Sequence, residues 1–369
     1  MITRYTVIII LSLFIGSQGV PAQSFDLTIH EYGLSIGNSP RLNGIRINAI
    51  DRNVQRINGI NITLWKAAEE GAEEVNGLAL GLVAPEARYL RGIAIGGIGA
   101  SGTEQLTGIS IGGLGAGAGG DFTGIGIGLL GAGSGESLTG IVIGGLGAGA
   151  GTSLRGIALG GLGAGAGRDL SGIAIGLLGA GAGNSMNGII IGGLGAGAGT
   201  SFNGIALGGL GAGAGKNVSG IVISGIGAGA GGFMDGIAIS GFAVGAGRSM
   251  RGIGLAVFAA GAGEDAAGLF ISGGAVGAGS RFHGIGIGGL GVQGSKEIVG
   301  CAIAGALVKT AHLRGFAAGG YTKTQKTSGL TVGIINVAET LNGVQIGLLN
   351  IARNNPRGLQ LLPLINIHF

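Results

Sequence analysis

The sequence is poor in the residues that build most globular enzymes. Of its 369 residues, 10% are charged and 4% are aromatic, and it contains 5 prolines and 1 cysteine. An ordinary enzyme of this length would have more aromatic residues in a mixed core. The net charge of +4 is too small and too dispersed for a nucleic-acid-binding surface. The single cysteine, Cys301, excludes an intramolecular disulfide.

Glycine is abundant instead, with 91 residues arranged in a 16-residue repeat. Leu138 to Ser153 (LTGIVIGGLGAGAGTS) is one copy, and we number its positions 1 to 16 from Leu138. Copies follow one another without insertion or deletion from Leu106 to Leu313. They begin at residues 106, 122, 138, 154, 170, 186, 202, 218, 234, 250, 266, 282 and 298.

The composition of this unit favours β-structure. Its six glycines argue against a helix, because each interior glycine costs about 1 kcal/mol relative to alanine. Collagen is excluded, since glycine does not occupy every third position. What remains is two-residue alternation, which shifts phase after Gly144-Gly145 and predicts two short strands joined at a glycine corner. We expect one inward apolar set, made of Leu138, Ile141, Ile143, Leu146, Ala148 and Ala150.

Two all-β architectures could use such a unit. The first is a parallel β-solenoid, in which each unit of about 16 residues is one coil and equal positions stack. The alternative is an outer-membrane antiparallel β-barrel of about 22 strands, suggested by twelve-residue apolar runs and an alternating final strand that ends at Phe369.

The repeat itself favours the solenoid. A closed barrel needs a net stagger between neighbouring strands. If all units were equal, the turns at both rims would be the same and their contributions to the stagger would cancel. In addition, three units are duplicated as a block of 48 residues, so that Leu129-Leu130 recurs as Leu177-Leu178. Copying an odd number of antiparallel strands would exchange the two rims, whereas copying three coils changes nothing.

The chain divides into four segments. Residues 1–22 resemble a secretory signal peptide, with Arg4, an apolar stretch from Val7 to Ile15 and the exit Val20-Pro21-Ala22. Residues 23–105 form irregular N-terminal repeats, 106–313 the strict repeats, and 314–369 the C-terminal repeats and final strand. The signal peptide predicts an exported protein of the cell envelope, in the outer membrane, at the cell surface or in the periplasm.

The irregular segments keep parts of the pattern. N-terminal units open at Gly44, Gly59, Gly77 and Gly92, and Ile45 and Ile47 alternate with Arg46 and Asn48 in a conventional amphipathic pattern. The insert from Lys66 to Glu74 is expected to be a solvated loop. Near the C-terminus, Asn336 and Asn350 replace glycine and are expected to form a hydrogen-bonded ladder.

Polar residues of the strict repeats gather at positions 15, 16 and 2. A solenoid would place them in one mixed-charge ridge along an edge, with His283 among them, and leave mostly glycine backbone on the rest of its surface. Such a surface could bind another copy of the chain, an envelope glycan or the outer membrane.

No residues converge on recognisable chemistry. GxGxxG strings arise from the repeat and open no helix, which argues against a dinucleotide site. The four histidines lack metal-ligand spacing with one another or with Cys301, which we expect to be a small buried hydrophobe at position 4. Carboxylates such as Asp235 and Glu264 lie on separate coils without a catalytic partner. We therefore expect no catalytic, cofactor-binding or metal-binding residues, no small-molecule substrate and no enzyme.

The repeats GIIN (333–336) and GVQIGLLN (343–350), with the ending LPLINIHF (362–369), resemble those of uncharacterised bacterial surface-repeat proteins. The resemblance implies an envelope location and adds no functional residues. The sequence thus predicts a non-enzymatic structural or interaction protein of the bacterial envelope, with an outer-membrane barrel that has a pore or transport role as the alternative.

Overall fold

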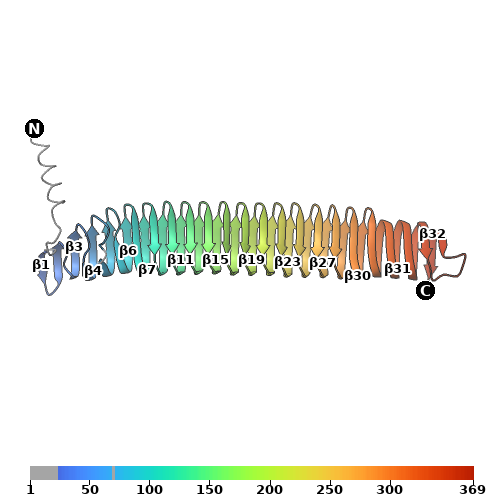
Figure 1. Ribbon diagram of the computed structural model, residues 1–369, viewed down its shortest axis with the longest axis horizontal. Helices are drawn as coiled ribbons and strands as arrows, with labels where there is room; N and C mark the ends of the chain where they lie inside the picture. The colour runs from blue at the N-terminus through green and yellow to red at the C-terminus, as the bar shows by residue number, and fades with distance from the viewer. Residues whose placement is uncertain (1–23, 69–70) are drawn as a thin grey trace, which may run out of the picture. The chain divides into compact units, whose positions relative to one another are not determined.

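The computed structural model describes residues 24–68 and 71–369, in which strands and short turns occur and helices do not. The proposed signal peptide lies outside these residues. The chain divides into two compact units, within residues 1–136 and 137–369. In each unit the strands lie side by side as a stack (Figure 1).

Unit 1 begins with an antiparallel hairpin of β1 and β2, and every later pairing resolved within the unit is parallel. Gly44, Gly59, Gly77 and Gly92 stack in register, which confirms the irregular repeats. The last three residues of the insert, Ala72 to Glu74, belong to β5, so they are not a loop. The strands are β1 (Phe25–Ile29), β2 (Tyr32–Ile36), β3 (Arg41–Asn48), β4 (Val54–Thr63), β5 (Ala72–Gly81), β6 (Glu86–Gly96), β7 (Gly99–Gly112), β8 (Gly115–Ala118), β9 (Asp121–Gly128) and β10 (Gly131–Ser134).

Unit 2 contains most of the strict repeats and the C-terminal segment. Its strands are β11 (Ser137–Gly144), β12 (Gly147–Ala150), β13 (Ser153–Gly160), β14 (Gly163–Ala166), β15 (Asp169–Gly176), β16 (Gly179–Ala182), β17 (Ser185–Gly192), β18 (Gly195–Ala198), β19 (Ser201–Gly208), β20 (Gly211–Ala214), β21 (Asn217–Ser224), β22 (Gly227–Ala230), β23 (Phe233–Ser240), β24 (Ala243–Ala246), β25 (Ser249–Ala256), β26 (Ala259–Ala262), β27 (Asp265–Ser272), β28 (Ala275–Ala278), β29 (Arg281–Gly288), β30 (Gly291–Ala304), β31 (Leu307–Ala352) and β32 (Leu361–His368).

From β11 to β28 each coil contributes one long strand and one short strand, and each strand pairs in parallel with its counterpart in the next coil. Leu138 lies beside Leu154, and Ala148 beside Ala164, so equal positions stack 16 residues apart. This register confirms the parallel β-solenoid. The antiparallel barrel was wrong, because its repeats would have to alternate in direction.

The expected inward-facing set is confirmed at Leu138, Ala148 and Ala150 and is wrong at Ile141, Ile143 and Leu146. Positions 1, 5, 7, 11 and 13 face the interior, represented by Leu138, Val142, Gly144, Ala148 and Ala150. The isoleucines at positions 4 and 6 and the leucine at position 9 face outward. The buried side chains occupy odd-numbered positions in both strands. The turn at positions 8 and 9 therefore does not change which positions face inward. Grouping residues by hydrophobicity instead of by parity produced the error.

The two strands of a coil lie close together beside the turn at positions 8 and 9. At position 7, a Cβ added to Gly160 would lie 1.8 Å from the Gly163 carbonyl oxygen of the same coil. Inside the coil, a phenylalanine at position 1 is accompanied by glycine or alanine at position 5. A Cβ at Gly286 (position 5) would lie 2.9 Å from Cζ of Phe282 (position 1).

Position 3 is the one place where every coil requires glycine for its backbone. Gly156 has a φ of 130°, and a Cβ there would lie 2.0 Å from the carbonyl oxygen of Gly140, one coil earlier. Few residues other than glycine adopt such a conformation. The stack of these glycines holds successive long strands in register.

Polar side chains fill the interior at the start of unit 1. Arg46 occupies inward position 5, is 0% exposed and forms an ion pair with Asp51 at 2.7 Å. Its guanidinium also donates to the Oδ1 atoms of Asn61 at 3.0 Å and Asn38 at 2.7 Å. Burial lowers the pKa of Arg46, and the charge of Asp51 opposes that effect. The alternation of Ile45 with Arg46 therefore has its polar side inside.

A second polar interior lies at the end of unit 2. Asn336 Nδ2 donates to Asn350 Oδ1 at 2.8 Å, and Thr322 Oγ1 donates to Asn336 Oδ1 at 2.6 Å. Both asparagines are fully buried, which confirms the predicted ladder. The final strand β32 pairs antiparallel with the end of β31, Ile346 lying beside Ile365.

Candidate interaction surface

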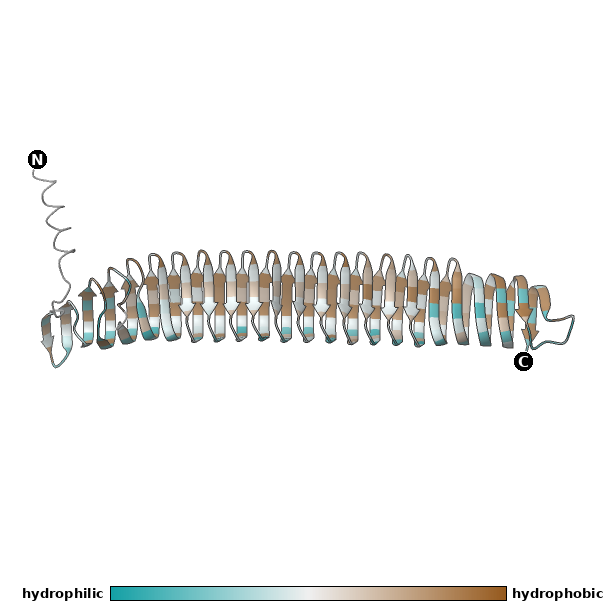
Figure 2. Ribbon diagram, in the orientation of Figure 1, coloured by the Kyte–Doolittle hydropathy of each residue, from teal (hydrophilic) through white to brown (hydrophobic). Residues whose placement is uncertain are grey.

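The most distinctive surface of unit 2 is a band of apolar side chains that we call the apolar edge. It consists of positions 4, 6 and 9 in the successive coils. The position-9 residues sit at the turn and are 44 to 66% exposed where they are large, from Leu162 to Leu290. At position 6, Ile143 is 39% and Ile175 is 38% exposed. Figure 2 shows the apolar turns along one side of the stack.

Positions 4 and 6 of the apolar edge vary less from coil to coil than inward positions 1 and 5 do. Position 4 is isoleucine in every coil from 138 to 253, and position 6 is isoleucine or leucine throughout. Inward position 5, by contrast, ranges from glycine at Gly254 to phenylalanine at Phe270. Repeats usually keep their core and vary their surface. Positions 4 and 6 depart from this pattern, because they face outward and keep Ile or Leu in every coil from 138 to 281.

The short strands carry glycine on their outer face. At Gly147, Gly195 and Gly227 (position 10), an added Cβ would meet no atom within 4 Å. Packing within the stack therefore does not require glycine at these positions. The result is a flat flank without side chains, as the sequence predicted for part of the surface.

Aromatic residues extend the apolar edge at two neighbouring turns. The Phe242 and Phe258 rings lie 4.5 Å apart between centroids and are 52% and 55% exposed. Exposed aromatic pairs retain much unburied apolar area. The two rings therefore enlarge the exposed apolar surface at this part of the apolar edge.

Charged residues lie at the opposite turn, at positions 15, 16 and 2, which we call the polar edge. Arg281 there pairs with Asp265 at 2.9 Å, and its hydrogen bonds lower the pKa of the Asp265 carboxyl. His283 is exposed among them, as predicted. The mixed-charge ridge is confirmed, and Figure 2 shows it on the side away from the apolar turns.

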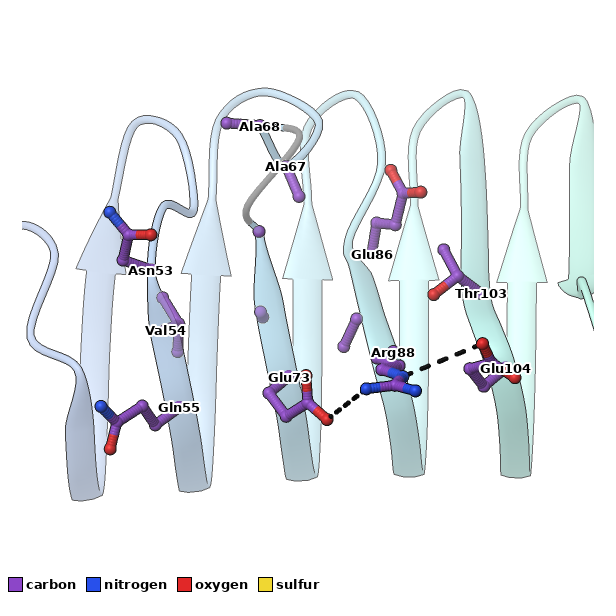
Figure 3. A pocket seen from close by; sticks show the side chains of 13 residues that line it. Asn53, Val54, Gln55, Ala67, Ala68, Glu73, Glu86, Arg88, Thr103 and Glu104 are labelled. Atoms are coloured by element: carbon purple, nitrogen blue, oxygen red, sulfur yellow. Dashed lines mark hydrogen bonds and ion pairs between the residues drawn. The ribbon is translucent and has the colours of Figure 1, made fainter.

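A polar groove of about 580 Å³ lies in unit 1 between the ends of β4 to β7. Figure 3 shows Arg88 between two carboxylates, Glu73 at 3.1 Å and Glu104 at 3.8 Å. The charge of Glu73, together with that of Tyr89, raises the pKa of Arg88. These three charged side chains pair with one another at an exposed site.

A second groove, of about 870 Å³, lies in unit 2 beside β30 and β31. Lys309, Lys323 and Lys326 line it together with Glu339. No sequence motif predicts this groove, because the three lysines are brought together only by stacking of 14-residue coils. Its chemistry is that of a solvated basic surface.

The described residues contain no group of three or more His, Cys, Asp or Glu side chains placed to hold a metal ion. In the same part of the chain, no helix is long and apolar enough to cross a membrane. Cys301 lies half-buried on the outer face at position 4, so it is not the interior residue that we expected. Burial raises the pKa of its thiol.

Comparisons with protein-family models, with curated proteins and with solved structures found no match to this chain. The apolar edge, the glycine flank and the polar edge are therefore interpreted from their own geometry.

Proposed function

We propose that the chain is a non-enzymatic structural or interaction protein, exported to the cell envelope, and that the apolar edge is its binding surface. One observation carries this proposal, namely that the apolar side chains at positions 4, 6 and 9 face outward in addition to the apolar core at positions 1 and 5. A protein selected only for a stable soluble stack would carry polar side chains at these outward positions.

The size of the apolar edge supports a binding role. Full burial of one leucine or isoleucine is worth about 1.5–3 kcal/mol, so the half-exposed residues of one coil leave roughly 2 kcal/mol unrealised. Nine complete coils from 138 to 281 repeat this arrangement. At about 100 Å² per coil their exposed apolar area approaches 900 Å², above the roughly 300–600 Å² of the largest patch on a typical monomer.

The export part of the proposal rests on the N-terminal sequence and on the resemblance to bacterial surface-repeat proteins. The pore alternative needed antiparallel repeats, and the parallel register removes its basis. A long stack with one apolar edge instead suits attachment along an extended partner.

Cell fractionation tests this function. The full chain, signal segment included, is expressed in a bacterial host, and envelope and soluble fractions are compared before and after detergent extraction. We expect a shortened chain in the envelope that detergent releases. A variant with serine at Leu146, Leu162, Leu178, Leu194 and Leu210 should leave the envelope in buffer alone.

The control carries five substitutions in the same coils at the opposite turn, with alanine at Thr139, Arg155, Ser171, Asn187 and Asn203. It should fractionate like the unaltered chain. An unprocessed chain that stays in the cytoplasm without detergent would contradict the proposal.

A further inference from the structure

The proposed function leaves open what covers the apolar edge, and the structure points to one occupant. Resting on that function, we propose that the apolar edge of unit 2 inserts from one side into the hydrocarbon of a lipid surface. The polar edge then stays in water. Four features of the coils carry this inference.

The first feature is the separation of charge along the coil. In the nine coils from 138 to 281, every charged residue lies at position 15, 16 or 2. At positions 4 to 14 the only polar side chains are Ser224, Ser240 and Ser272, and these point inward and are buried. Insertion would therefore bring no charge and no exposed polar side chain into hydrocarbon.

The second feature is that the apolar surface continues around the turn. Isoleucines cover one flank, position-9 leucines cover the tip, and glycines cover the other flank. A flat protein partner, including a second copy, would cover one flank and leave the tip and the opposite flank in water. A fluid hydrocarbon phase covers all three at once.

The third feature is the hydrogen bonding of the turn backbone. Lipid tolerates a turn only when its backbone polar groups have partners within the protein. Leu162 N donates to Leu146 O at 2.8 Å, and Gly163 N donates to the same oxygen at 3.1 Å. Gly161 N donates to Gly144 O at 3.1 Å, so the three turn N–H groups of this coil are paired with the carbonyls of Gly144 and Leu146 in the preceding coil.

The fourth feature is depth. At 3.3 Å per residue, position 6 lies about 10 Å from the tip at position 9, and position 4 lies about 16 Å from the tip. One leaflet of hydrocarbon is about 15 Å thick, half of a bilayer core. The apolar zone therefore fits into one leaflet and stops where positions 2 and 16 become polar.

Coils of this design need no anionic headgroup. The charged residues of the nine coils are six cations and four anions, which lie at the polar edge, away from the lipid. Apolar contact alone should hold the chain on a neutral surface. This expectation separates insertion from electrostatic adsorption, which salt would weaken.

The test uses the full mature chain and neutral phosphatidylcholine vesicles. The protein is mixed with vesicles as detergent is removed, and vesicle-bound protein is recovered by flotation at 0.15 M and 1 M salt. We expect the chain to float equally at both salt concentrations. The variant with serine at the five tip leucines should lose at least about tenfold in partitioning, whereas the polar-edge control should not.

Environment-sensitive fluorophores then report depth. Probes are placed at Leu210→Cys on the tip and at Asn203→Cys on the polar edge, both in a Cys301→Ser background. On vesicles, the tip probe should shift to the blue and be quenched by brominated acyl chains, while the polar-edge probe should do neither. Circular dichroism of each variant without lipid shows that its strands are retained.

Two results would overturn the inference. In one, the folded chain stays at the bottom of the gradient with vesicles present. In the other, it forms dimers whose contact is lost in the tip variant while no tip probe enters lipid, which would make a second copy the occupant. Either result leaves the proposed envelope function standing if fractionation still places the chain there.

Discussion

Replacing Ile190 and Ile191 one at a time tests which side of the coil is inside. Ile190 occupies position 5, is 0% exposed and stands between Ala174 and Ala206 in the ladder. Ile190→Ala removes three carbon atoms, or about 2.4 kcal/mol at 0.8 kcal/mol per carbon. The flanking alanines cannot fill the space, so a cavity term raises the cost to about 2.5–4 kcal/mol. Ile191 faces outward, and Ile191→Ala should cost about 1 kcal/mol or less.

Hydrogen exchange of the β17 and β18 amides suits this comparison, because a repeat array opens locally and global unfolding is not one transition. At about 1.4 kcal/mol per factor of ten, Ile190→Ala should lower protection roughly 50- to 1000-fold. Ile191→Ala should lower it by less than about tenfold. If Ile191→Ala costs as much as Ile190→Ala, the assignment of the two faces is wrong, and with it the apolar edge.

Three further predictions concern single sites. Gly156→Ala should destabilise its coil by several kcal/mol, because φ is 130° and the added Cβ would meet a carbonyl oxygen. Gly147→Ala is the control in open space, and it should change the stability measured by thermal unfolding by about 1 kcal/mol or less. Asp51→Ala should lower the stability of unit 1 by about 3–5 kcal/mol in urea unfolding, since Arg46 would keep a buried charge without its partner; a loss below about 1 kcal/mol would contradict the buried pair. The raised pKa of Cys301 means less thiolate at pH 7.5, so iodoacetamide should label it more slowly than free cysteine and faster as pH rises; equal rates at pH 7.5 would argue against its burial.

The stacking of coils followed from the repeat itself. Units of equal length and a duplicated block of three are compatible with parallel coils and incompatible with antiparallel strands. The polar residues at positions 15, 16 and 2 likewise had to meet along one edge, because equal positions of stacked coils coincide. The Asn336–Asn350 ladder followed from the same rule, since a buried asparagine finds its partner one coil away.

The facing of the side chains did not follow from hydrophobicity. Both parities of the long strand carry apolar residues, so either could form a core. The isoleucines at positions 4 and 6 are larger than most residues at position 5, and size therefore favours the wrong parity. One signal was present in the sequence. Positions 1 and 5 compensate in volume, as in Phe122 with Gly126 and Ala266 with Phe270, whereas positions 4 and 6 do not. Residues that exchange volume share one packed space.

The buried Arg46 gave no comparable signal, because an arginine that alternates with isoleucines is usually on the solvent side. Its place depends on Asp51, Asn38 and Asn61, which reach it from a turn, a loop and the next coil. The sequence alone therefore favoured a parallel glycine-rich stack with one polar edge, because equal positions of stacked coils coincide, and it left an antiparallel barrel as the alternative. Only the tertiary structure decided between the two, through the parallel register of successive coils. It also decided that the apolar residues at positions 4, 6 and 9 lie outside, because positions 1, 5 and 7 are the parity of the long strand that faces the short strand.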